Sequence, residues 1–323
     1  MSIVDHRPLL DLHELRLQYR LPSGGLHSAL DGVSLQLWPG ETLGLVGESG
    51  CGKSTLARAV MRLVPLQAGR IHFDGEDIGR LPRRTLAQRV RPSLQMVFQD
   101  PYASLNPRTR IGDALVEPLR IHRRGTAQEQ HAQALDMLAR VGLAAEAAQR
   151  YPHEFSGGQR QRIAIARALM LRPRLLVCDE AVSALDVSVR AQVLNLLLEL
   201  RQSLGLAMLF ISHDLAVVEY IADRVAVLYL GRIMEIAPAR DIIRTPKHPY
   251  TQALLSAVPE PDPDAKRRRI VLQGDLPSPM APPSGCVFRT RCPYAIAACA
   301  EAVPDLREIA PGHRTACIRT DIL

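Results

Sequence analysis

The sequence contains no apolar run long enough to cross a lipid bilayer, which takes about 20 consecutive residues in a helix. Its longest apolar runs, such as Leu206–Ile211, have the length of a buried strand instead. The first residues, Met1–His6, also lack the basic segment and the apolar core of a secretory signal. We therefore expect a cytoplasmic chain that acts at a membrane only through partner proteins.

The sequence also lacks internal repeats and coiled-coil heptads, which excludes repeat architectures and long coiled coils. Hydrophobic residues make up 47% and charged residues 23% of the chain, as in ordinary globular proteins. The net charge is +7, and most of the excess is Arg scattered along helical stretches, which predicts solvated surfaces. The dense run Lys266–Arg269 lies among Pro and Asp residues and predicts an exposed linker, with a contact to lipid or nucleic acid as the alternative.

Strand and helix patterns alternate along most of the chain. Residues 9–19 and 29–37 alternate apolar and polar side chains, which predicts half-exposed strands and a small antiparallel sheet. Short apolar segments predict buried strands at 42–46, 175–178 and 206–211. Helical patterns follow from Lys53 and over 187–203, so we expect an α/β fold with a mainly parallel sheet core. Residues 100–170 predict an inserted helical subdomain.

A phosphate-binding loop is predicted between the strand at 42–46 and the helix that begins at Lys53. The spacing matches the P-loop pattern, in which glycines let backbone amides and a helix N-terminus converge on phosphate. Lys53 would reach the β- and γ-phosphates, and the hydroxyl of Ser54 would ligate Mg²⁺. A chance glycine-rich turn is the alternative. The loop consists of Gly47, Glu48, Ser49, Gly50, Cys51, Gly52, Lys53, Ser54 and Thr55, with Cys51 expected to be a small side chain rather than a reactive thiol.

Two carboxylates, Asp179 and Glu180, follow the apolar segment Leu175–Cys178. In an open parallel sheet, ligands bind at the carboxyl ends of the strands. Asp179 would therefore hold Mg²⁺, directly or through water, and Glu180 would polarise the attacking water. The alternative is an acidic helix cap, since Asp and Glu favour helix starts.

The segment Phe155–Arg162 resembles the signature sequence of ATP-binding cassette (ABC) proteins, with Phe where Leu is commoner. A Ser-Gly-Gly segment at a helix N-terminus can donate several N–H groups to a γ-phosphate. In that family these donors face the ATP of the opposite subunit, so two chains sandwich two nucleotides. The resemblance implies this role for Ser156, Gly157, Gly158 and Gln159.

Other elements of the same family occur in the expected order. Gln99 matches the glutamine that senses Mg²⁺ and water and couples to the membrane subunit, and His213 matches the switch histidine at the γ-phosphate. Asp186, in Ser183–Asp186, matches the segment that contacts the partner subunit. Tyr19 lies where the family stacks an aromatic ring on adenine, although it could simply pack in the small sheet.

Three further segments are similar to the ATPases of oligopeptide and dipeptide importers: Val97–Pro107, Arg150–Glu154 and His248–Leu254. The resemblance is to the second of the two ATPase subunits of such importers and runs from about residue 10 to the C-terminus. It implies a peripheral protein at the cytoplasmic face of the inner membrane. Its partners would be a second ABC ATPase in a heterodimer, two transmembrane permease subunits and an extracytoplasmic substrate-binding protein. Ala181 departs from the pattern, which usually has Pro after the catalytic Glu.

The predicted organisation is an ABC cassette over residues 9–255 and a Cys-rich region over 256–323. The predicted activity is hydrolysis of Mg-ATP that drives uptake of peptides or related small solutes, without nucleic acid as a partner. Alternatives are a soluble ABC ATPase that acts on nucleic acid and a phosphotransferase with a P-loop. The first would need a long coiled coil or two cassettes, and the second has no use for Phe155–Gln159 or His213.

Four of the six cysteines lie in the last 40 residues of the chain. A cytosolic chain should not pair them as disulfides, and four thiols in a Pro-rich segment suggest a metal centre that orders it. The tight C-x2-C pairs of many zinc sites are absent, and the looser spacing is compatible with a [4Fe–4S] cluster. The peptide-importer resemblance points the same way, while zinc and free buried thiols stay open. The cysteines are Cys286, Cys292, Cys299 and Cys317.

Overall fold

The computed structural model describes residues 7–20, 25–257, 270, 272, 274–275 and 277–320. The predicted basic linker Lys266–Arg269 lies outside these residues. The chain divides into two compact units. The first comprises residues 1–37, 42–79 and 210–323, and the second comprises residues 38–41 and 80–209.

The first unit contains the small antiparallel sheet that the sequence predicts. Its strands lie in the order β2-β1-β4-β5. Alternate leucines of β1 are buried, as the apolar and polar alternation requires, and a register shift at 13–14 interrupts the pairing with β2. The strands are β1 (Leu10–Arg20), β2 (Leu26–Leu37), β4 (Ala68–Phe73) and β5 (Glu76–Asp77).

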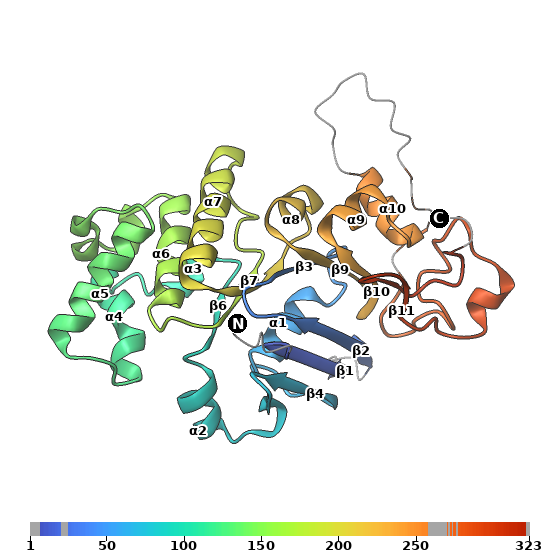
Figure 1. Ribbon diagram of the computed structural model, residues 1–323, viewed down its shortest axis with the longest axis horizontal. Coiled ribbons are helices and arrows are strands. Elements are labelled where there is room, and N and C mark those ends of the chain that lie inside the picture. Colours follow the sequence, from blue (N-terminus) through green and yellow to red (C-terminus); the bar gives the residue numbers. More distant parts are fainter. Residues whose placement is uncertain are drawn as a thin grey trace, which may run out of the picture. The chain divides into compact units, whose positions relative to one another are not determined.

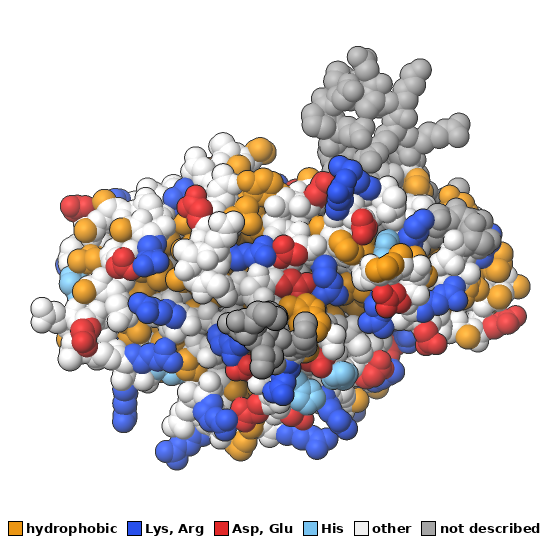
Figure 2. All heavy atoms as spheres, in the orientation of Figure 1, with side chains coloured by type: hydrophobic (Ala, Val, Ile, Leu, Met, Phe, Trp, Pro, Cys, Tyr) orange, Lys and Arg blue, Asp and Glu red, His pale blue; other side chains and the backbone are white. Residues whose placement is uncertain are grey.

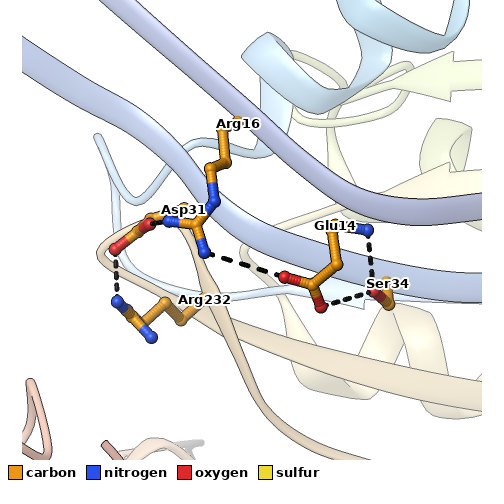
Figure 3. A network of polar contacts seen from close by, with 5 residues as sticks. All are labelled: Glu14, Arg16, Asp31, Ser34 and Arg232. Atoms are coloured by element: carbon orange, nitrogen blue, oxygen red, sulfur yellow. Dashed lines mark hydrogen bonds and ion pairs between the residues drawn. The ribbon is translucent and has the colours of Figure 1, made fainter. Parts of the chain in front are cut away.

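A polar network ties this sheet to strand β10 (Arg232–Pro238). The carboxylate of Asp31 accepts hydrogen bonds from both Arg16 and Arg232, as Figure 3 shows. Ser34 Oγ donates to Glu14 Oε1 at 3.2 Å and accepts from the backbone N–H of Glu14 at 2.9 Å. The Asp31 N–H also donates to the carbonyl of Gly231 at 2.9 Å. These contacts fix the small sheet against the rest of its unit.

The first unit also holds part of a larger sheet. Strand β3 (Thr42–Val46) pairs in parallel with β9 (Arg224–Tyr229), and both are almost wholly buried. Strand β10 pairs antiparallel with β9 and with β12 (His313–Thr315), which pairs in turn with β11 (Arg307–Ala310). The helices are α1 (Lys53–Val60), α8 (Leu215–Ile221), α9 (Ala239–Arg244) and α10 (Pro249–Ser256), with 3-10 turns η1 (Ile78–Arg80), which ends at the unit boundary, and η5 (Ala297–Ala300).

In the second unit, strands β6 (Leu94–Val97) and β7 (Leu175–Asp179) pair in parallel. Helices α4, α5 and α6 pack together, coloured green in Figure 1, because each turns its buried residues toward the others. Strand β8 (Ala207–Ile211) crosses the boundary between the units. The helices are α2 (Arg83–Thr85), α3 (Pro101–Ser104), α4 (Ile111–Ile121), α5 (Ala127–Arg140), α6 (Gly157–Leu169) and α7 (Val187–Leu204), with short turns η2 (Leu86–Val90), η3 (Ala145–Gln149) and η4 (Pro152–Glu154).

Parallel pairs, a separate antiparallel sheet and covering helices confirm the predicted α/β class. Among the residues that the structure describes, no helix combines the length and the apolar character that a bilayer crossing requires.

Candidate active site

A glycine-rich loop joins the end of β3 to the start of α1, where the sequence predicts phosphate binding. The backbone approaches two of its glycines closely. A Cβ on Gly47 would lie 2.2 Å from the carbonyl oxygen of Leu228, and one on Gly52 would lie 2.4 Å from that of Ala29. Both glycines also have positive φ, 155° and 111°. Since only glycine tolerates both conditions, these residues permit the tight loop that a phosphate cradle needs.

The side chain of Lys53 lies folded over this loop. Its Nζ donates to the carbonyl oxygens of Gly47 at 2.8 Å and Glu48 at 2.9 Å, and the residue is only 5% exposed. The first turn of α1 carries no acidic residue, so its N-terminus keeps its positive partial charge. A phosphate oxygen could therefore replace these carbonyls as the partner of the ammonium group.

Cys51 is buried within the loop, and this burial raises the pKa of its thiol, with nearby Lys53 opposing the shift. The thiol is therefore neutral at physiological pH, which agrees with the prediction of a small side chain rather than a nucleophile.

Glu48 has contacts that the sequence analysis missed. Its backbone N–H donates to the hydroxyl of Tyr250 at 2.9 Å, and its carboxylate accepts two hydrogen bonds from Arg291. Arg291 lies 243 positions further along the chain, so no local pattern could have indicated the pair. Tyr250 lies in the segment His248–Leu254, which resembles peptide importers, and Arg291 directly precedes Cys292, one of the four C-terminal cysteines.

His213 lies in the first unit, between β8 and α8. The N–H of the preceding residue, Ser212, donates to the carbonyl of Leu45 at 3.1 Å. That bond places His213 near the carboxyl end of β3, the same strand end from which the phosphate loop begins. Asp214 caps α8 by accepting from the N–H of Ala216 at 3.0 Å, and His213 is exposed. The structure thus brings His213 and the loop to one strand end.

Tyr19 lies near the end of β1, opposite His27 of β2, and is partly exposed. An aromatic face at that position is accessible to a planar ligand.

In the second unit, the structure brings Gln99 and Glu180 together. Because β6 and β7 are parallel and Val97 pairs with Cys178, the residues that follow both strands emerge at one edge. Gln99 Nε2 donates to Glu180 Oε2 at 3.1 Å. Glu180 adopts a left-handed backbone with φ of 48°, and its carbonyl accepts from the N–H and the hydroxyl of Ser183. Such strain in a non-glycine residue is typical of functional sites.

Asp179, the last residue of β7, is 5% exposed. The preceding residue, Cys178, is fully buried, and burial raises the pKa of its thiol to about 12, with the charge of Asp179 adding to the effect. Asp179 and Glu180 thus differ in setting: one carboxylate is buried at a strand end, and the other is partly exposed beside an amide. That difference suits a metal ligand and a water-orienting group, respectively.

The signature segment forms the start of α6. Ser156 Oγ accepts from the N–H of Gln159 at 3.3 Å, and Gln159 Oε1 accepts from the N–H of Ser156 at 3.0 Å, which closes a capping box. Phe155 is buried and so fixes the entry to the helix. A Cβ on Gly158 would lie 2.3 Å from Val189, whereas one on Gly157 would meet nothing within 4 Å. Gly158 is therefore packed tightly against α7, whereas the space beside Gly157 is open.

Asp186 lies at the N-cap of α7 and is exposed. The residues just before it line a hollow of about 300 Å³ with the start of α6 and the segment after β6. Lining residues include Gln99, Gly157, Ser183 and Leu185. The second unit therefore gathers Gln99, the signature glycine and the Ser183–Asp186 segment around one hollow.

The four C-terminal cysteines line one small cavity in the first unit, together with His248 and Phe288. All four are free thiols, and Cys286, Cys299 and Cys317 are buried. Burial raises the pKa of the Cys286 thiol to about 11, and the neighbouring cysteines add to that shift. Among the described residues, only Asp11, His13 and His72 bring three potential metal ligands within 4.8 Å of one another. No three of the four cysteine sulfurs therefore lie within that distance of one another.

Family models match two parts of the chain. The model described as "ABC transporter" matches residues 30–183, and that described as "Oligopeptide/dipeptide transporter, C-terminal region" matches residues 234–299.

Similar proteins extend over nearly the whole length. A Brucella ovis protein named "Putative peptide import ATP-binding protein" is 58% identical over 98% of this chain and 99% of its own. The oligopeptide transport ATP-binding protein AppF of Bacillus subtilis is 51% identical over 98% of this chain and 99% of its own. OppF of Escherichia coli, which bears the same description, is 50% identical over 98% and 97%.

Solved structures of the same kind match the cassette. A dimeric, post-hydrolysis state of the ATP-binding cassette MJ0796 bound to ADP and Pi has a TM-score of 0.65 and 28% identity, over 72% of this chain and 99% of that one. The protein cbiO1 of Clostridium perfringens, part of an ABC transporter complex, has a TM-score of 0.65 and 27% identity, over 74% and 91%.

Proposed function

The chain belongs to the ABC transporter family, as an ATP-hydrolysing subunit of the oligopeptide and dipeptide type, and from this membership we propose how its residues divide the work. Two observations support the proposal: the nearly full-length similarity to oligopeptide transport proteins, and the pairing of Gln99 with Glu180 at the end of two parallel strands.

ATP binds to the loop from Gly47 to Thr55, with its adenine against Tyr19. The amides of the loop and of α1 hold the phosphate oxygens, and Lys53 moves from the carbonyls of Gly47 and Glu48 to the β- and γ-phosphates. The ammonium group thus exchanges one set of oxygen partners for another.

Hydrolysis depends on Glu180, which orients water for in-line attack on the γ-phosphate. Gln99 holds the carboxylate of Glu180 through the 3.1 Å hydrogen bond, and its amide oxygen would be available to a metal ion. His213 lies near the strand end that begins the phosphate loop and stabilises the charge on the γ-phosphate.

Each unit supplies oxygen groups of the kind that a magnesium ion takes, which are hydroxyl and carboxylate oxygens. Ser54 supplies a hydroxyl in the first turn of α1, and Asp179 supplies a buried carboxylate at a strand end. Gln99 adds an amide oxygen. An ion held by these groups would supply positive charge against the phosphate oxygens.

The signature segment Ser156–Gln159 serves the nucleotide of a partner cassette. The space beside Gly157 is open, and the first turn of α6 holds no acidic residue. The backbone amides of this turn therefore suit an incoming phosphate. Asp186, exposed at the N-cap of α7, contacts the same partner. We propose that this partner is a second, different ABC ATPase and that the pair forms a heterodimer.

The pair drives two transmembrane permease subunits, which receive peptides or related small solutes from an extracytoplasmic binding protein. Residues next to Gln99 offer a docking surface for the permease: Phe98 is 46% exposed and Tyr102 is 61% exposed. Through this contact the chain lies peripherally at the cytoplasmic face of the membrane. Charges of both signs are interspersed on the face in Figure 2.

The cassette spans residues 9–255 and the Cys-rich region spans 256–323. We propose that Cys286, Cys292, Cys299 and Cys317 hold a [4Fe–4S] cluster. A tetrahedral zinc ion, with Zn–S of about 2.3 Å, would set the sulfurs about 3.8 Å apart. These thiols line one cavity, and no three of them lie within 4.8 Å of one another, which favours a larger group; cluster binding would lower the raised pKa of the Cys286 thiol.

Glu180→Gln tests the catalytic assignment. The amide keeps the shape of the side chain but cannot polarise water, so ATP hydrolysis should fall at least about a hundredfold while ATP binding persists. Phosphate release and fluorescent-nucleotide titration measure the two quantities. The control Glu219→Gln changes an exposed glutamate of α8 and should behave as wild type. Near-normal turnover in Glu180→Gln would refute the assignment.

A further inference from the structure

A partly buried ion pair joins the phosphate loop to the C-terminal Cys-rich region within the first unit. Arg291 Nη1 donates to Glu48 Oε2 at 2.7 Å, and Nη2 donates to Glu48 Oε1 at 3.2 Å. The side chain of Arg291 is 10% exposed and that of Glu48 is 28% exposed. Two parallel hydrogen bonds fix the plane of the carboxylate as well as its distance, which a single contact could not do.

Glu48 is held at its backbone as well. Its N–H donates to the hydroxyl of Tyr250 at 2.9 Å, and its carbonyl accepts from Lys53 Nζ at 2.9 Å. The second residue of the phosphate loop is therefore fixed at three points. One of these points is the lysine that binds phosphate in the proposed function.

Arg291 owes its position to the cysteine turn, residues 286–292. Its N–H donates to the carbonyl of Phe288 at 3.0 Å, and the N–H of Arg289 donates to the carbonyl of Cys286 at 3.0 Å. Phe288 is fully buried, and its ring centroid lies 5.3 Å from that of Tyr250. Cys292 follows Arg291 directly. The same turn thus carries two of the four clustered cysteines and the guanidinium that binds the carboxylate of Glu48 in the loop.

We propose that Arg291 is a positioning residue for the phosphate loop, through which the cysteine turn sets the affinity of the chain for ATP. The inference rests on the proposed function, in which the loop binds ATP. A bare carboxylate at Glu48 would repel an incoming triphosphate, and the bidentate guanidinium cancels that charge while it holds the loop in shape. Order in the cysteine turn is therefore transmitted to the site of nucleotide binding.

Removing the guanidinium should weaken ATP binding more than it slows chemistry. In Arg291→Met the affinity for a fluorescent ATP analogue should fall on the order of tenfold, with KM for ATP rising and kcat nearly unchanged. Arg291→Lys should recover part of the loss, because it restores the charge without the fork. Glu48→Gln in the Arg291→Met background should recover most of it, because the repelling carboxylate is gone.

Arg289→Met is the matched control. Arg289 lies in the same turn, but its side chain bonds to Ser284 and not to the loop, so this variant should bind ATP as wild type does. Each variant is compared as the full chain by thermal unfolding. If Arg291→Met is insoluble, Arg291→Lys and the double variant carry the test by the same criteria.

The outcomes distinguish a failure of the proposed function from a failure of the inference about Arg291. A wild-type chain that fails to bind ATP would refute the proposed function itself. If the wild type binds, wild-type affinity in Arg291→Met would overturn only the inference. An equal loss in Arg289→Met, or no recovery in the double variant, would overturn it as well.

Discussion

Backbone conformation, as much as side-chain chemistry, determines which residues can occupy the candidate site positions of each unit. Glu180 adopts a left-handed backbone, which costs a non-glycine residue about 1 kcal/mol or more, and Ser183 holds it there by two hydrogen bonds. The strain aims its carboxylate at Gln99. Gly47 shows the opposite case, in which the absence of a side chain is the requirement.

Gly47→Ala should damage the phosphate loop. The added Cβ would lie 2.2 Å from the carbonyl oxygen of Leu228, so the loop has to shift. A displacement that costs about 2 kcal/mol would reduce ATP affinity roughly thirtyfold, which nucleotide titration measures.

Gly50→Ala provides the comparison, because Gly50 also has positive φ but a Cβ there meets nothing within 4 Å. Its loss of affinity should be clearly smaller. Equal losses in the two variants would show that the left-handed backbone, and not the close approach at Leu228, is what requires glycine.

Most elements that carry the site could be predicted because their signals are local. The apolar segment before Asp179 predicted β7, and the helical pattern over 187–203 matches α7 at Val187–Leu204. The pair Glu48–Arg291 could not be predicted, because no pattern relates residues 243 positions apart. Strands β11 and β12 were also missed, since they are short and half polar and form only by pairing next to β10.

Helix α10 gives a pH prediction at the scale of an element. Its N-cap residue, His248, is buried and accepts from the N–H of Tyr250 through Nδ1 at 3.0 Å. Burial lowers its pKa from 6.5 to about 3. The neutral ring therefore stabilises the fold fully above pH 6.5, and this contribution is lost as pH falls from there toward 3, by up to roughly 1.4 kcal/mol per pH unit.

His248→Asn should flatten the acid side of the stability curve, since Asn caps a helix without titrating. Urea unfolding at pH 7, 6 and 5 (roughly the window in which only the unfolded ring gains its proton) measures the slope. His131→Asn, at an exposed site on α5, should leave the slope as in wild type. A slope that survives in His248→Asn would assign it to another group.

For the molecule as a whole, the proposed cluster would make the stability of the Cys-rich region depend on a bound group as well as on packing. Its four thiols come from positions spread over Cys286–Cys317, and they line one cavity. A bound cluster would therefore close several loops at once and stabilise the region.

Protein purified without oxygen should be brown, show the visible absorbance of an iron–sulfur cluster and contain about four iron atoms per chain. Cys292→Ser should lose iron and lower the melting temperature by several degrees, roughly 2–4 °C per kcal/mol at this size. Cys51→Ala, in the phosphate loop, should keep its iron. A colourless, iron-free wild type would reject the cluster. If that protein contained zinc, the cysteines would be assigned to a zinc site instead.

The capping box at the start of α6 has a consequence for a protomer on its own. The hydroxyl of Ser156 and the side chain of Gln159 each accept from the other's backbone N–H, so the start of α6 is formed without a ligand. In the proposed function, a partner's phosphate would therefore meet a helix start that is already ordered, and its binding would not have to supply the free energy of folding this turn.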